Sequence, residues 1–90
     1  MTEQNSDHFL TALTAIPSGA SIRHWRGQKY QTTKDVHLGG KLIKLYAEGL
    51  AHKDHISFNL HLLDAGEKLS PCEMPAEKVI DFVVNSTATQ

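Results

Sequence analysis

The stretch DHISFNLHLL, residues 54–63, decides the fold because apolar and polar side chains alternate along it. A period of two places the apolar side chains on one face of a strand and the polar ones on the other. The first set is Ile56, Phe58, Leu60 and Leu62, and the second is His55, Ser57, Asn59 and His61. This pattern predicts an antiparallel sheet that is covered on one face only.

The preceding segment, Lys41 to Gly49, predicts a partner strand with an apolar and a polar face of its own. A slip of one residue would bury the polar side chains. The favoured register is therefore the one that places the two apolar faces together. That register opposes Ile43 with Leu60, Leu45 with Phe58, Ala47 with Ile56, Lys44 with Asn59, Tyr46 with Ser57, and Glu48 with His55. Gly39-Gly40 suits a two-residue turn that returns residues 29–37 onto this strand and opposes Val36 with Ile43.

Glycine also marks the turn before residue 29. In Gly27-Gln28 the glycine would take the first central position of a type II′ turn, which joins residues 22–26 to the sheet. Trp25 and Tyr30 would then form an aromatic pair on the covered face. Pro71 limits Lys68-Leu69-Ser70 to a short edge segment. We therefore expect a four-stranded antiparallel meander.

A helix is predicted on either side of the strands. Before them, Phe9, Leu10, Leu13 and Ile16 share one helical face, with Asn5 or Ser6 as the cap and Pro17 at the end. After them, Pro75 begins a helix whose apolar stripe is Val79, Ile80, Val83 and Val84. The expected fold is α+β, with an N-terminal helix, the meander and a C-terminal helix, and both helices on one face of the sheet. We expect a single domain over residues 1–90, with flexible tails at 1–5 and 85–90.

Composition restricts the class of protein. The chain of 90 residues is 40% hydrophobic, has one cysteine, and contains no apolar run long enough to span a bilayer. One cysteine excludes an internal disulfide and a zinc site built on several thiolates. The acidic, polar start does not resemble a signal peptide, so we expect a cytoplasmic protein with no membrane association.

Charge is unevenly distributed although the formal net charge is only -1. Residues 17–46 contain six Lys or Arg against one Asp, whereas residues 47–90 contain three Lys against seven Asp or Glu. This asymmetry favours an acidic partner for the first segment.

The polar face of the predicted sheet is the candidate functional site. It combines cations, carboxylates, histidines, amides and one aromatic ring, although a plain solvated face is the simplest alternative. Its candidate binding residues are Arg26, Lys29, Lys44, Tyr46, Glu48, His55, Ser57, Asn59 and His61. We interpret the chain as a small binding or interaction module that uses this face or an edge strand, with a protein partner or a second copy.

Two other functions remain open from the sequence. Arg26, Lys29, Lys44 and Tyr46 could bind RNA or single-stranded DNA, with cations on phosphates and the ring on a base. A small enzyme or ligand pocket could instead use Glu48 to orient His55 as a general base.

Named catalytic motifs are absent from the sequence, and we predict no catalytic residue, no cofactor and no metal site. Six positions separate His55 from His61 on one strand, roughly 20 Å, so the two cannot share an ion. Cys72 lies close to the predicted helix start at Pro75, but a packed side chain is the favoured interpretation of a lone cysteine. An enzyme is therefore the less favoured interpretation.

The order of a helix, three strong strands and a helix resembles the double-stranded-RNA-binding domain. The resemblance is topological and covers most of the chain. The basic cluster that this family places at the start of its last helix is missing, because the corresponding stretch is Pro75-Ala76-Glu77-Lys78. Membership is therefore not assigned.

Overall fold

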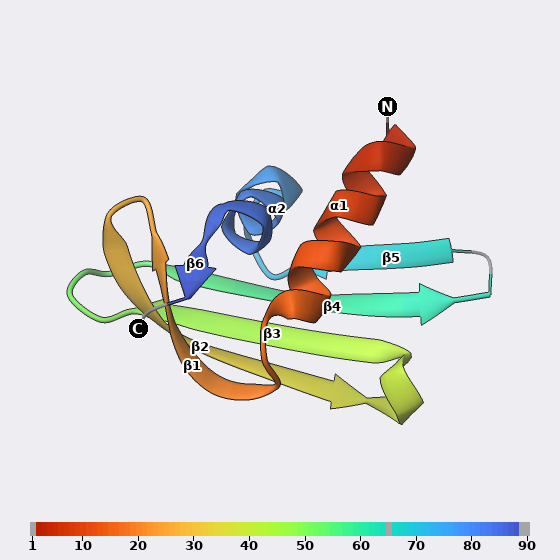
Figure 1. Cartoon of the computed structure of the whole chain (residues 1–90), viewed down its shortest axis with the longest axis horizontal. Helices are drawn as coiled ribbons and strands as arrows, with labels where there is room; N and C mark the ends of the chain where they lie inside the picture. Colours follow the sequence, from red (N-terminus) through yellow and green to blue (C-terminus); the bar gives the residue numbers. More distant parts are fainter. Residues whose placement is uncertain (1, 65, 89–90) are drawn as a thin grey trace.

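The computed structural model describes residues 2–64 and 66–88, with side chains from His8 onward, and combines two helices with one antiparallel sheet (Figure 1). The elements are α1 (Thr2–Ala15), β1 (Gly19–Trp25), β2 (Gln28–His37), the short 3₁₀ turn η1 (Leu38–Gly40), β3 (Leu42–Gly49), β4 (His55–Leu63), β5 (Gly66–Pro71), α2 (Ala76–Asn85) and β6 (Thr87–Ala88). The α+β class is confirmed. Within the described residues, neither helix is long and apolar enough to cross a membrane.

The sheet has six strands, in the order β5-β4-β3-β2-β1-β6, so the prediction of four was wrong. β5 pairs with β4 over its whole length, and Pro71 is its last residue, opposite Phe58. A proline is tolerated there because β5 is an edge strand and needs no N–H on its free side. Five strands separate the two helices, where the resemblance to the double-stranded-RNA-binding domain implied three.

The registers of the central strands are confirmed. β3 pairs with β4 so that Leu45 opposes Phe58 and Glu48 opposes His55. β2 pairs with β3 so that Val36 opposes Ile43, across the turn formed by η1. Matching of apolar residues was sufficient to predict these pairings, because any slip would exchange the buried and exposed faces.

The turn between β1 and β2 differs from the prediction. Its central residues are Arg26 and Gly27, both with positive φ (52° and 76°), which is typical of a type I′ turn, and Trp25 opposes Gln28. Glycine occupies the second central position instead of the first. Trp25 and Tyr30 nevertheless lie on the covered face, buried in edge-to-face contact with ring centroids 5.7 Å apart.

Secondary structure extends into both end segments of the chain. α1 begins at Thr2, before the predicted caps Asn5 and Ser6. At the other end, Asn85 belongs to α2 and Thr87–Ala88 pairs with β1 as β6. Residues 1, 89 and 90 lie outside the described residues.

Side chains from both helices enter one core. Phe9 of α1 lies 6.0 Å from Phe58 between ring centroids, and Phe82 of α2 lies 5.4 Å from both Trp25 and Tyr30. These three strand residues share one face of the sheet, and Figure 1 shows both helices on that side. In the part of the chain that the structure describes, no element covers the opposite face.

Two buried cations on the covered face bind the ends of the helices. The Lys34 ammonium donates hydrogen bonds of 2.8 Å to the carbonyls of Leu13 and Ile16, at the end of α1. The Arg23 guanidinium donates to the hydroxyl and the carbonyl of Ser86, directly after α2. Helix C-termini present unpaired carbonyls and a partial negative charge, so each cation satisfies groups that burial would otherwise leave unpaired. Burial lowers the pKa of both side chains.

Candidate functional site

The open face is the side of the sheet opposite the helices, and eight of the nine predicted site residues lie on it. They occupy alternate positions of β2, β3 and β4, pointing away from the core. They are Lys29, Lys44, Tyr46, Glu48, His55, Ser57, Asn59 and His61. The register places Tyr46 beside Ser57 and Glu48 beside His55.

Arg26 is the exception and does not contribute to the open face. Because it lies in the β1–β2 turn, its side chain folds toward α2, where Nη2 lies 3.3 Å from Oδ2 of Asp81. The guanidinium also lies 4.3 Å from the centre of the Trp25 ring. Hydrogen bonds from Trp25, Asn85 and Arg26, the first being the strongest influence, lower the pKa of Asp81.

An aromatic pair stands on two inner strands of the open face, at the end nearest the β3–β4 loop. The rings of Tyr46 on β3 and His55 on β4 are stacked, with centroids 6.2 Å apart and planes inclined by 26°. Tyr46 remains 46% exposed. A tyrosine in this position offers a large contact area with few rotatable bonds to immobilise.

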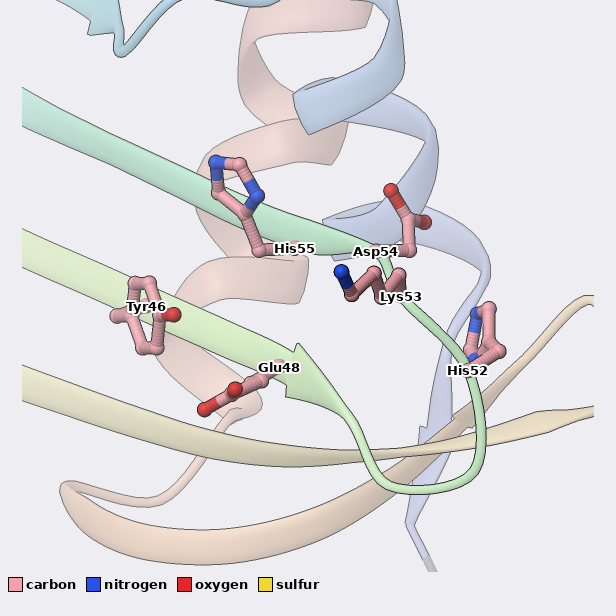
Figure 2. A pocket seen from close by; sticks show the side chains of 6 residues that line it. All are labelled: Tyr46, Glu48, His52, Lys53, Asp54 and His55. Carbon is pink, nitrogen blue, oxygen red and sulfur yellow. The ribbon is translucent and has the colours of Figure 1, made fainter.

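A hollow of about 390 Å³ adjoins this pair (Figure 2). Its lining comes from β3, from the β3–β4 loop and from the start of β4, and comprises Tyr46, Glu48, His52, Lys53, Asp54 and His55. The prediction missed His52, Lys53 and Asp54 as site residues. The sequence feature that could have identified them is the run of charged and titratable residues 52–54, which lies between two strands that both contribute to the open face.

Hydrogen bonds anchor the loop behind the hollow to the core and to α2. Asp54 accepts from the Lys78 ammonium at 2.6 Å and from the Tyr30 hydroxyl at 2.7 Å. Nε2 of His52 lies 3.1 Å from the same hydroxyl oxygen. Since the single hydroxyl proton goes to Asp54, Nε2 of His52 is the donor to Tyr30. The loop is therefore tied to two other elements.

These contacts shift the titration of both acids. Burial by itself would raise the pKa of Asp54, but hydrogen bonds from Lys78 and Tyr30 outweigh it, and the pKa lies below its ordinary value. Burial, followed by the hydrogen bond to the Asp54 carboxylate, raises the pKa of Tyr30.

The Glu48–His55 pair that general-base catalysis would require is only partly formed. Glu48 and His55 are cross-strand neighbours as predicted, but His55 stacks on Tyr46, and no hydrogen bond joins it to Glu48 among the described side chains. Within residues 8–64 and 66–88, no three His, Cys, Asp or Glu side chains converge as metal ligands would. Cys72 is exposed and not packed as the sequence suggested.

Comparison with protein-family models, with curated proteins and with solved structures finds no match for this chain.

Proposed function

We propose that the chain is a protein-binding module whose partner docks on the open face. The single observation that carries this proposal is the exposed Tyr46 ring, stacked on His55 beside a hollow at the β3–β4 loop, on the uncovered face of the sheet. Tyrosine is enriched among the residues that dominate binding energy, especially where neighbouring side chains restrict it. Because the ring is already ordered and still 46% exposed, a partner can bury it at a small cost in side-chain entropy.

Charge makes a nucleic-acid partner the weaker candidate. Phosphate binding depends on several accessible cations. Of the cations in residues 17–46, Arg23 and Lys34 are buried against helix ends, and Arg26 is paired with Asp81. Three of the six remain accessible: Lys29 and Lys44 on the open face, and Lys41 in the β2–β3 turn.

Site-specific photocross-linking in cells tests the proposal. A benzophenone amino acid replaces Tyr46 in one variant and Ile80, an exposed residue of α2, in a matched control. We expect a defined protein adduct from position 46 that is absent from position 80. No adduct at 46, or the same adducts at both positions, would refute the proposal.

Fluorescence anisotropy with mixed RNA and DNA oligonucleotides separates the nucleic-acid alternative. We expect no binding at low salt. Binding that weakens steeply as salt is added, and that is lost when Lys29 and Lys44 are both replaced by Gln, would favour nucleic acid instead.

A further inference from the structure

The hollow has an acidic and a basic side. Glu48 extends from β3, whereas Lys53 extends from the β3–β4 loop, and Figure 2 shows the two side chains separated across the hollow. Both residues are exposed, and among the described side chains neither is in an ion pair. Each charge is therefore available to a partner that presents the opposite charge at the matching position.

We infer that the partner is a second copy of this chain, docked open face to open face about a two-fold axis that lies between Glu48 and Lys53. This inference rests on the proposed function and names its partner. A two-fold axis in the interface exchanges the two sides of the hollow. Glu48 of each copy then meets Lys53 of the other, so one favourable contact occurs twice.

The exposed apolar side chains fit the same arrangement. Tyr46 precedes Glu48 on β3 and is 46% exposed, while Leu50 begins the loop that contains Lys53 and is 53% exposed. Exchanging the two sides of the hollow brings the Tyr46 ring of one copy toward the loop of the other, where Leu50 lies. An isologous interface needs one patch that complements itself, and this patch pairs charge with opposite charge and ring with aliphatic side chain.

Size and net charge permit such a dimer. The five longer strands contain 40 residues, which at about 3.3 Å rise and about 4.8 Å strand spacing give the sheet face a plane area of roughly 600 Å², comparable to the accessible surface of about 800 Å² that each partner buries in a standard interface. A net charge of -1 leaves little long-range repulsion between copies.

A charge-exchange series in the full chain tests the inference. Sedimentation equilibrium from micromolar to millimolar concentration measures the dimer dissociation constant of the wild type, Glu48→Lys, Lys53→Glu and the double variant. We expect each single reversal to weaken the dimer by about tenfold or more, because a repulsive pair replaces an attractive one at two places. The double variant should recover the wild-type affinity, because every cross-copy pair is again attractive.

Glu67→Lys is the matched control, since it makes the same charge change on β5, outside the hollow. It should leave the dissociation constant unchanged. A wild type that stays monomeric over the whole range, a double variant that remains weak, or an equal loss in Glu67→Lys would each overturn the inference. If the wild type is monomeric while position 46 cross-links to a different protein, the second copy is refuted and the binding module stands. If position 46 gives no adduct, the module itself fails.

Discussion

Replacing Asp54 by Asn tests whether the hydrogen bonds behind the hollow stabilise the whole domain. The wild-type carboxylate accepts from Lys78 of α2 at 2.6 Å and from Tyr30 of β2 at 2.7 Å. Asn has nearly the same shape but no charge, and one of its two polar atoms is a donor. Asp54→Asn therefore removes the ion pair and leaves at most one of the two hydrogen bonds in its wild-type form.

The expected cost is about 2 kcal/mol in the free energy of unfolding. A hydrogen bond to a charged group contributes roughly 1.5–3 kcal/mol, and a fully buried ion pair that loses one partner costs roughly 3–5 kcal/mol. The value here is lower because the Asp54 and Lys78 side chains keep 24% and 30% of their exposure, so water can solvate the lysine that is left. For a domain of this size, about 2 kcal/mol corresponds to a fall of about 10 °C in Tm.

The difference in the free energy of unfolding between the wild type and Asp54→Asn should depend on pH. The folded pKa of Asp54 lies below its ordinary value, so its stabilising contribution is complete above the unfolded pKa of about 4. That contribution is lost as the pH falls through the folded pKa, since the folded state must then take up a proton. Asp81 also has a lowered pKa, but it titrates in both proteins and cancels in their difference.

Urea unfolding followed by tryptophan fluorescence measures the effect, because Trp25 is buried in the core. The wild type, Asp54→Asn and the control Glu67→Gln are compared at neutral pH and at a series of acidic values. The control removes an exposed carboxylate from β5 and should change stability by less than about 0.5 kcal/mol. A neutral-pH difference below about 0.5 kcal/mol for Asp54→Asn, or a difference that does not shrink in acid, would refute the reasoning.

Two further substitutions test how the fold is held. Lys34→Met keeps the buried aliphatic part of the side chain but removes the ammonium that donates to the carbonyls of Leu13 and Ile16 at the end of α1. It should lower the free energy of unfolding by about 1.5 kcal/mol in urea titrations. Gly49→Ala should cost about 2 kcal/mol in the same measurement, because the added methyl group would lie 2.6 Å from Cε1 of His52 and 2.7 Å from its carbonyl oxygen.

Each of these substitutions has a control in the same part of the molecule. Lys29→Met changes an exposed lysine of the same strand and should leave stability nearly unchanged. Thr33→Ala, on the open face of β2, should likewise cost less than Gly49→Ala. Equal effects in Lys34→Met and Lys29→Met would show that the buried ammonium does not stabilise α1.

The alternation of side chains over residues 41–63 was enough to predict β3, β4 and their register. The physical reason is local, since a shift of one residue would bury His55 and expose Phe58. The same reasoning placed Tyr46 and Glu48 on the open face. Gly39-Gly40 also predicted the β2–β3 register correctly, although the connection is the four-residue turn Leu38–Lys41 and not the expected two-residue turn, and Leu38 shares the positive φ of the two glycines.

Tertiary structure decided everything that depends on partners distant in the chain. Alternation along β1 places Arg23 on the same face as Trp25, but its guanidinium can be buried there because Ser86, 63 positions later, offers it a hydroxyl and a carbonyl beside the β1–β6 pairing. Lys34 is buried for the corresponding reason at the end of α1. The β3–β4 loop forms one wall of the hollow because Asp54 reaches Lys78. Sequence patterns record which side chains are polar, but burial of a charge depends on a partner that only the folded chain supplies.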